Sequence, residues 1–322
     1  MSERTVRKIN EKIARQEEII REEKSELIAK GYRYISHIGS GSFSDVFRVW
    51  DAQRNCFLAC KVSVYPKLAV REAKLLQELQ HPLFPQYKEN WQSGDKHYLL
   101  MEEIAGSSIR ELIQNRGYFS QRQAVHIAFA LAQGLQYLHE RSEPIVFRDI
   151  KPENVMVRQD GSVKLVDVGC ACRKGESKTI AGSRGYGAPE QFQRKENVSE
   201  ESDIYALGNL LFLMLTGEEP CKMEELLCKK NKYKRNRYKK NQYKKNQYKK
   251  KIAPGLLQLI AQATKNERSR RLPDMRTFCQ RLTIYEGRRC LSRFYTDARA
   301  LLCGGLVADF YYVQNVRKDS CL

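Results

Sequence analysis

The sequence predicts an α+β fold with two lobes, a small β-rich lobe followed by a larger helical one. Short β-like runs occupy most of the stretch from Tyr32 to Glu102. From Ile109 onward, segments with helical periodicity dominate instead. A β-rich part followed by a helical part is typical of two packed lobes, and ligand sites commonly lie in the cleft between such lobes.

Ahead of the first strand, the patterns predict a charged helix. Residues 1–30 are dense in Glu, Lys and Arg, and they place Ile9, Ile13, Ile20 and Leu27 at helix-compatible spacings. We interpret residues 1–31 as an N-terminal helical extension that ends at Gly31, a residue suited to a left-handed cap. The sequence leaves open whether this helix docks on the body of the protein or on a partner.

Within the two lobes, the patterns predict strands around one helix, and then two long helices with short strands between them. The expected elements of the small lobe are strands at Tyr32 to Ile38, Val46 to Asp51, Phe57 to Val64 and Tyr98 to Glu102, and a helix at Val70 to Leu79. Those of the large lobe are helices at Gln121 to Glu140 and Ser202 to Leu215, and strands near Val155 and Val163.

The composition is that of a globular chain. Of the 322 residues, 42% are hydrophobic, which is enough for a normal core. The longest apolar run, Leu207 to Leu215, is too short to cross a bilayer, and the first residues lack the pattern of a secretory signal. The ten cysteines show no paired metal-binding spacing, which is typical of reduced thiols. We therefore expect a cytoplasmic protein without a membrane span.

Most of the formal charge of +19 comes from one segment. Residues 229–251 hold 13 Lys and Arg and no acidic residue, and they include four repeats of Asn-x-Tyr-Lys-(Lys or Arg). A five-residue period gives neither a helix nor a strand one face to bury, so we predict a solvated loop. The competing hypothesis is that this segment binds a polyanion, with lysines on phosphates and tyrosines stacked on bases.

A glycine-rich segment, Gly39-Ser-Gly41-Ser-Phe-Ser44-Asp-Val46, lies between two predicted strands. Glycines in such a hairpin let backbone amides approach nucleotide phosphates closely. Taken alone, the segment fits an ordinary hairpin bulge as well. Lys61, in the strand pattern that follows, is either a solvated lysine or a phosphate ligand held by Glu72 on the next helical pattern.

The segment from Val146 to Val155 carries Asp149, Lys151 and Asn154 on a loop after a long helix. Phosphoryl transfer requires positioning and charge neutralisation more than covalent chemistry. An aspartate can accept the proton of a substrate hydroxyl, a lysine can neutralise the moving phosphoryl group, and an asparagine can bind Mg²⁺. Asp167, at the end of a later strand pattern, adds a second oxygen ligand of the kind that Mg²⁺ prefers.

The glycine-rich segment, Lys61, Glu72, the segment with Asp149, and Asp167 follow one another in this order, and Ala188-Pro-Glu190 comes after them. As an ordered series they resemble eukaryotic-like (Hanks-type) protein kinases over roughly Tyr32 to Tyr285. The resemblance implies a bilobal protein-kinase-like domain at 32–285, followed by a C-terminal extension at 286–322. Its N-lobe would span 32–102, and its C-lobe 105–285 with the basic insert 229–251. The amino-acid sequences of Leu165 to Cys172 and of Ala188 to Phe192 most resemble those of kinases from Gram-positive bacteria.

The same resemblance implies roles for individual residues. Asp149 is expected to be the catalytic base and Lys151 to contact the γ-phosphate of ATP, while Asn154 and Asp167 bind Mg²⁺, which Mn²⁺ is able to replace. The expected ATP-binding residues are Gly39, Ser40, Gly41, Ser42, Phe43, Val46, Ala59, Lys61, Glu72, Met101, Glu102 and Ile104.

The resemblance also implies three supporting contacts. Glu72 is preferred to Glu78 as the partner of Lys61, because it stands nine residues before His81-Pro82. Asp203 is expected to brace the catalytic loop, which the resemblance places at residues 147–154. Either Arg270 or Arg271 is expected to pair with Glu190, and the spacing does not decide between them.

The segment after Asp167 bears on substrate and regulation. Ser183 resembles the hydroxyl residue that bonds the base and the lysine in serine/threonine kinases. The function expected is therefore that of a non-specific serine/threonine protein kinase, acting on protein substrates and on itself. Ser177 and Thr179 are candidate phosphorylation sites, because a phosphate there could pair with Arg148.

Three positions depart from the family's pattern: Ser44 replaces the third glycine, Phe147 a histidine and Val168 a phenylalanine. None of them is a group that touches ATP, metal or the phosphoryl group in the family. The alternative function is that of a catalytically weak or dead kinase fold that binds nucleic acid or acidic protein through the basic insert. A small-molecule kinase is disfavoured by Ser183 and Ala188-Pro-Glu190.

Overall fold

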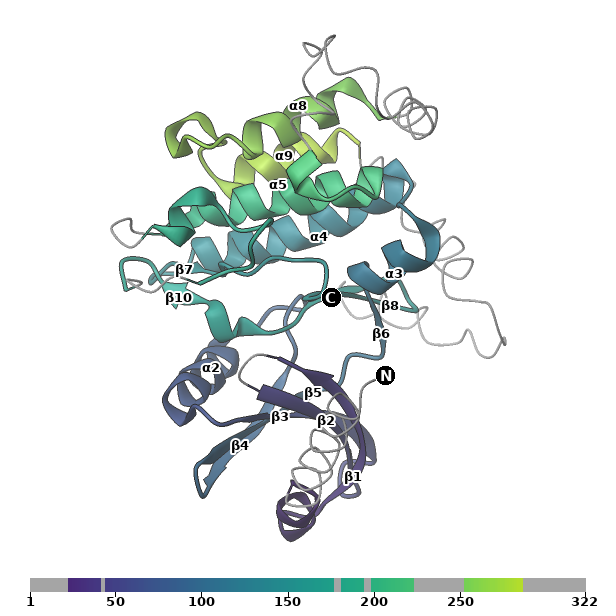
Figure 1. The fold of residues 1–322 in the computed structure, drawn as a ribbon, viewed down its shortest axis with the longest axis vertical. Coiled ribbons are helices and arrows are strands. Elements are labelled where there is room, and N and C mark those ends of the chain that lie inside the picture. Colours follow the sequence, from purple (N-terminus) through teal and green to yellow (C-terminus); the bar gives the residue numbers. More distant parts are fainter. Residues whose placement is uncertain (1–22, 42–43, 177–180, 194–197, 223–251, 286–322) are drawn as a thin grey trace, which may run out of the picture.

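The computed structural model describes residues 23–41, 44–176, 181–193, 198–222 and 252–285. The two predicted lobes are confirmed in this part of the chain. Figure 1 shows a sheet with helix α2 beside it at one end of the molecule and a group of helices at the other.

The small lobe is built on one antiparallel sheet with the strand order β1-β2-β3-β5-β4. Its elements are β1 (Tyr32–Ser40), β2 (Ser44–Asp51), β3 (Cys56–Ser63), α2 (Pro66–Glu78), β4 (Tyr87–Ser93) and β5 (Lys96–Glu102). The sequence patterns predict all of these except β4. That strand lies at the edge of the sheet and carries mostly polar, partly exposed side chains, so it lacks the alternation by which strands are recognised.

Alternation along β3 separates the two faces of the sheet. Leu58, Cys60 and Val62 belong to a core cluster on one face, whereas Ala59 belongs to the main core on the other. Because side chains two residues apart share a face, Lys61 lies on the same side as Ala59. The main core is the one to which α2 and the large lobe contribute, so the register directs Lys61 toward the boundary between the lobes.

Residues 23–29 are helical and dock on the outer face of the sheet, which answers the question that the sequence leaves open. Leu27 is fully buried among the residues of that face. Buried Glu23 accepts a hydrogen bond from Lys96 Nζ at 2.7 Å, and Glu26 accepts bonds from Trp91 and Ser93 on β4, each at 2.9 Å. The rest of the predicted helix, residues 1–22, lies outside the described residues.

The large lobe is mainly helical. Its helices are α3 (Ile109–Arg116), α4 (Gln121–His139), α5 (Glu200–Thr216), α8 (Pro254–Ala263) and α9 (Met275–Thr283), and α4 packs against both α5 and α9. Short 3-10 turns occur at Val168–Cys170, Pro189–Phe192, Pro220–Lys222 and Arg268–Arg270. Among the described residues, none of the helices combines the length and apolar character needed to traverse a bilayer.

Small sheets position the loops between these helices. The strands β6 (Gly106–Ser108), β8 (Val155–Arg158) and β9 (Val163–Leu165) form one sheet, and β7 (Ile145–Val146) pairs with β10 (Cys172–Arg173). The loop between β7 and β8 and the segment between β9 and β10 therefore emerge at the same place, facing the small lobe in Figure 1.

A close contact between Leu83 and α4 joins the two lobes. A Cβ atom at Gly134 would lie 2.1 Å from Leu83 Cδ2, so only glycine admits this side chain against the helix. The carbonyl of Leu83 also accepts a hydrogen bond from the Leu165 amide at 2.8 Å. The loop after α2 is thus fixed to the strand that leads to Asp167.

Leu27→Ala tests the docking of the N-terminal helix. We expect the variant to lower the free energy of unfolding by about 2 to 5 kcal/mol, as measured for buried leucines, because it removes apolar contacts and leaves a cavity. Urea denaturation measures the change. The matched control is Ile28→Ala, whose side chain is 65% exposed and should change the value by less than about 0.5 kcal/mol. Equal effects of the two variants would contradict the docking.

Candidate active site

The loop between β7 and β8 brings a carboxylate, a lysine and an amide together, and Ser183 adds a hydroxyl from a later segment. Asp149 Oδ2 accepts hydrogen bonds from Lys151 Nζ at 2.8 Å and from Asn154 Nδ2 at 3.0 Å. Asp149 Oδ1 accepts one from Ser183 Oγ at 2.7 Å, and Lys151 also donates to Ser183 Oγ at 3.1 Å. Four residues singled out separately in the sequence therefore share one set of hydrogen bonds around a single carboxylate.

The conformation of this loop depends on Asp203, a carboxylate with no exposed surface on α5. Its two oxygens accept hydrogen bonds from the backbone amides of Phe147 and Arg148, both at 2.8 Å. Arg148 has a φ of 70°, a left-handed conformation that costs a residue with a side chain about 1 to 3 kcal/mol. Charge-assisted bonds to Asp203 offset that cost and hold Asp149, the next residue, in position.

His139 is a supporting residue that the motifs did not indicate. It lies at the end of α4, and its Nε2 is 2.9 Å from Asp203 Oδ2. A buried carboxylate with several hydrogen-bond partners is fixed in one orientation, which suits a brace. The signal in the sequence is weak, because a histidine near the end of a helix is common for reasons unrelated to any site.

Lys61 connects the two lobes. Its Nζ donates to Glu72 Oε1 at 2.7 Å and Oε2 at 2.9 Å, and to Asp167 Oδ1 at 2.7 Å. Glu78 is not part of this arrangement and instead pairs with Arg141 and Arg173. The structure therefore places Glu72, as the sequence analysis preferred, beside the lysine.

The charges of these groups support one another. Burial disfavours the ammonium of Lys61, but the carboxylates of Glu72 and Asp167 outweigh it and raise the lysine pKa. Partial burial likewise opposes ionisation of Asp167, and the nearby Lys61 reverses the effect and lowers the Asp167 pKa. At Lys151 burial is again overcome, here by the hydrogen bond to Asp149, so that the lysine pKa is raised. Both lysines therefore stay cationic at neutral pH.

Asn154 and Asp167 fit the expected Mg²⁺ ligands by their donor chemistry. Asn154 Nδ2 donates to the carbonyl and the carboxylate of Asp149, which leaves its amide oxygen as the free acceptor. The Asp167 side chain is 45% exposed. In the described part of the chain, no three His, Cys, Asp or Glu side chains are grouped to hold a metal, so further ligands would come from phosphates and water, as is usual for Mg²⁺.

The glycine-rich segment forms the hairpin between β1 and β2. Gly39 pairs with Val46, and Val46 pairs in turn with Lys61 on β3. The Gly41 amide donates to the Ser44 carbonyl at 2.7 Å and closes the turn, and Ser40 Oγ donates to Asp45. The hairpin and the lysine are thus adjacent in one sheet. Ser42 and Phe43, also expected to bind ATP, lie outside the described residues.

Met101 and Glu102 end β5, where the chain passes from the small lobe to the large one. Met101 lies opposite Ala59 in the β3–β5 pair and is buried. The Glu102 side chain is held by Arg158, by Lys164 at 2.9 Å and by the Gln86 amide at 3.1 Å. These bonds overcome burial and lower the pKa of Glu102. The carboxylate therefore anchors the connection between the two lobes.

The segment that carries Ser183 is tied to the catalytic loop by Gln191, which the sequence analysis missed. The Gln191 side-chain amide donates to the carbonyls of Arg148 at 2.7 Å and Ala181 at 2.9 Å, and its oxygen accepts from the Ala188 amide. The only sign of this role in the sequence is that a polar residue directly follows Ala188-Pro-Glu190. Ser177 and Thr179 lie outside the described residues.

The three departures from the family pattern occupy structural positions. Ser44 begins β2 and supplies the carbonyl that closes the glycine turn. Phe147 and Val168 are both buried in the main core. None of the three is among the side chains that bond to Asp149 or Lys61, so the hydrogen-bonded groups around both are complete despite the changes.

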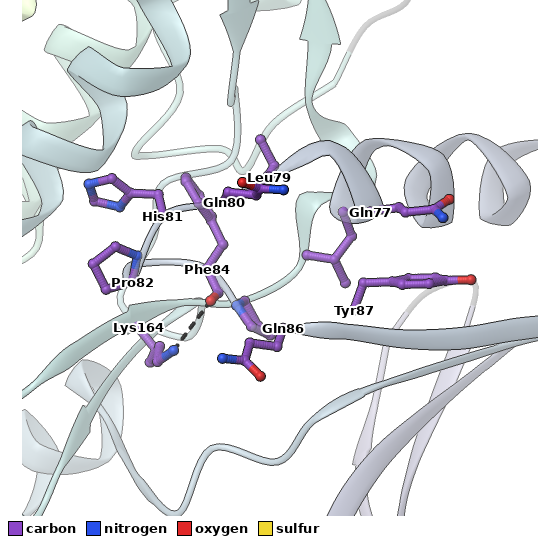
Figure 2. A pocket seen from close by; sticks show the side chains of 11 residues that line it. Gln77, Leu79, Gln80, His81, Pro82, Phe84, Gln86, Tyr87 and Lys164 are labelled. Carbon is purple, nitrogen blue, oxygen red and sulfur yellow. Dashed lines mark hydrogen bonds between the residues drawn. The ribbon is translucent and has the colours of Figure 1, made fainter.

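A cavity of about 540 Å³ lies away from these residues, beside the end of α2. Figure 2 shows Gln77, Gln80, His81 and Tyr87 around it, with Lys164 donating to the Phe84 carbonyl at 3.3 Å. None of the lining residues belongs to the predicted site. Two of the lining residues contact Glu102: Lys164 donates to its carboxylate at 2.9 Å, and so does the Gln86 amide at 3.1 Å.

Arg271 is the arginine that pairs with Glu190. Its guanidinium donates to both Glu190 oxygens, at 2.6 and 2.8 Å, and its side chain has no exposed surface. Burial works against the ionised Glu190, but Arg271 lowers the pKa of this carboxyl below its usual range. Arg270 is 71% exposed and pairs with Glu267 instead. The alternative left open by the sequence is thereby decided.

Arg271→Met should lower the free energy of unfolding by about 3 to 5 kcal/mol, because it leaves a buried carboxylate without its counterion. The matched control is Arg270→Met, which removes only an exposed pair and should cost less than about 1 kcal/mol. Urea denaturation of both variants checks the difference. An effect of Arg270→Met as large as that of Arg271→Met would be inconsistent with this pairing.

Comparison with known proteins agrees with this geometry. The family model described as the protein kinase domain matches residues 32–282. The human putative serine/threonine-protein kinase PRKY is 33% identical over 192 residues, which are 57% of this chain and 68% of the relative. The human cAMP-dependent protein kinase catalytic subunit PRKX is 32% identical over 195 residues, 58% of this chain and 54% of the relative.

A bacterial relative matches to a similar degree. The probable serine/threonine-protein kinase PknB of Lactococcus lactis is 31% identical over 208 residues, which are 60% of this chain and 33% of the relative. The chain thus spans two thirds of the PRKY length and about half or less of the other two. The matched residues 32–282 contain the Lys61–Glu72–Asp167 contacts, the catalytic loop with Asp149, and Arg271. The chain belongs to the protein kinase domain family.

Proposed function

We propose that the chain transfers the γ-phosphoryl group of ATP to serine or threonine hydroxyls of protein substrates, itself included. The observation that carries the proposal is the set of contacts at Asp149. Its carboxylate faces a hydroxyl, a lysine and an amide within hydrogen-bond distance. A carboxylate that already accepts a bond from the Ser183 hydroxyl is oriented to accept the proton of a substrate hydroxyl.

The neighbouring groups have complementary tasks in this proposal. Lys151 neutralises charge on the transferred phosphoryl group, and Lys61, positioned by Glu72, holds the α- and β-phosphates. Asn154 and Asp167 hold Mg²⁺, which would neutralise phosphate charge, and Mn²⁺ is able to take its place. The residues expected around the nucleotide are those of the glycine hairpin and of the connection at Met101, Glu102 and Ile104.

The choice of serine and threonine rests on local contacts and on the relatives. Ser183 bridges Asp149 and Lys151, the arrangement that the resemblance associates with serine/threonine kinases. The relatives PRKY and PknB are named as a putative and a probable serine/threonine-protein kinase. We also propose the Gram-positive bacterial type, which the Lactococcus relative supports at an identity close to that of the human ones.

The domain boundaries proposed are 32–285 for the kinase domain, with extensions on both sides. The family match over 32–282 and the end of α9 at Thr283 support the C-terminal limit. The basic insert 229–251 lies outside the described residues, so the polyanion hypothesis still rests on its sequence alone.

Asp149→Asn tests the proposed function directly. The variant keeps the size of the side chain but removes the proton acceptor, so kcat should fall by about 10² to 10⁴. Purified protein with radiolabelled ATP, Mg²⁺ and generic protein substrates gives the rate, and phosphoamino-acid analysis identifies the acceptor. Unchanged label transfer by the variant, with melting behaviour like that of the wild type, would rule out the role of Asp149.

Glu72→Gln tests how Lys61 is positioned. Loss of the carboxylate frees the ammonium to move, and displacement of a positioning group by about 1 Å can cost roughly 10²-fold in rate. We therefore expect kcat/KM for ATP to fall by about 10- to 100-fold. Glu78→Gln on the same helix is the matched control and should change kcat/KM by less than about threefold, because Glu78 pairs away from Lys61. Equal losses would assign the effect to α2 as a whole.

A further inference from the structure

Arg110, at the start of α3, is bound by an unusually complete set of partners. Its Nε donates to Glu153 at 2.7 Å, one terminal nitrogen donates to Glu219 at 2.6 Å, and the other lies 3.2 Å from the Tyr186 hydroxyl. Tyr186 in turn donates to the second Glu219 oxygen at 2.7 Å. Every nitrogen of the guanidinium therefore has a partner, and two carboxylates enclose it.

Both carboxylates remain accessible from solvent. The side chains of Glu153 and Glu219 are 47% and 45% exposed, whereas that of Arg110 is only 24% exposed. The arrangement is that of a half-open acidic site whose cation is provided by the protein itself.

This site adjoins the point at which a substrate hydroxyl would have to lie. Glu153 belongs to the catalytic loop, between Lys151 and Asn154, and Tyr186 follows Ser183 by three residues. The Arg110 amide also donates to the Pro152 carbonyl at 3.1 Å, which fixes α3 to the same loop. An extended peptide advances about 3.3 Å per residue, so residues within a few positions of the acceptor reach this surface.

We propose that Arg110 is a specificity-determining residue that occupies, from within the chain, the place of a substrate's basic side chain between Glu153 and Glu219. The inference rests on the proposed function, because it concerns the peptide presented to Asp149. A lysine or arginine beside the acceptor hydroxyl finds both carboxylates already engaged. The wild type therefore has no preference for peptides with a basic residue at these positions. Removal of Arg110 frees the two carboxylates and creates such a preference.

The experiment compares a neutral serine peptide with a set in which one arginine replaces each flanking position in turn. The quantity measured is the ratio of kcat/KM for each arginine peptide to that for the neutral peptide. For the wild type we expect ratios within about threefold of one. For Arg110→Met we expect at least one ratio to rise about fivefold or more, since partly exposed charge pairs contribute up to about 1 kcal/mol. In Arg110→Met/Glu219→Gln the gain should disappear.

Two variants complete the design. Arg276→Met is the matched control, because Arg276 also pairs with a glutamate, Glu140, but neither residue belongs to the proposed site. It should leave all ratios unchanged. Arg110→Lys keeps the charge but lacks the planar fork, so it should give a smaller rise and serves if Arg110→Met does not fold. A purely structural role of Arg110 would lower kcat/KM for all peptides alike and leave the ratios as they are.

The outcomes separate this inference from the function on which it rests. Ratios that stay within twofold of the wild-type values in both Arg110 variants, while the neutral peptide is still phosphorylated, overturn the inference alone. A wild type that already prefers arginine more than tenfold at a flanking position also overturns it. A wild type that phosphorylates neither these peptides nor protein substrates overturns the proposed function itself.

Discussion

The site depends first on one buried carboxylate. Asp203 lies on α5, the most deeply buried helix of the described residues, and accepts the backbone amides of Phe147 and Arg148. Without these bonds Arg148 would not keep its left-handed conformation, since that conformation is unfavourable for any residue with a Cβ atom. The backbone conformation of Arg148 in turn sets the direction in which the Asp149 side chain points. The helical core of the large lobe therefore determines where the proposed base points.

The second constraint acts between the lobes. Lys61 and Glu72 belong to the small lobe and Asp167 to the large one, so their contacts require the lobes to stand in one relative position. Arg71 on α2 adds a bond to the Ala171 carbonyl at 2.7 Å. Burial disfavours the charge of Lys61, and the two carboxylates outweigh that effect and raise the lysine pKa. Any movement of α2 away from the segment after Asp167 would separate these charges.

Buried polar groups support the surface that we propose to face the substrate. Gln191 links the carbonyls of Arg148 and Ala181, and Arg271 fixes Glu190 beside it. Ser183 is thus held against Asp149 by a segment whose polar atoms are paired, as buried polar groups must be. Arg110 closes the same surface from the side of α3. The proposed chemistry and the proposed specificity therefore rest on the same loop.

By itself the sequence determined the two-lobe architecture, most of the elements and the order of the chemical groups. Strand and helix periods are local, and Asp149, Lys151, Asn154 and Asp167 lie close together along the chain. Only the tertiary structure decided the partners that are distant in sequence: Arg271 rather than Arg270 for Glu190, the outer sheet face for Leu27, Asp203 with His139, and Arg110 between two glutamates. The edge strand β4 also escaped prediction, because its mostly polar side chains are all at least partly exposed and show no apolar alternation. Local patterns report which face is buried, whereas long-range ion pairs and hydrogen bonds depend on which surfaces meet after folding.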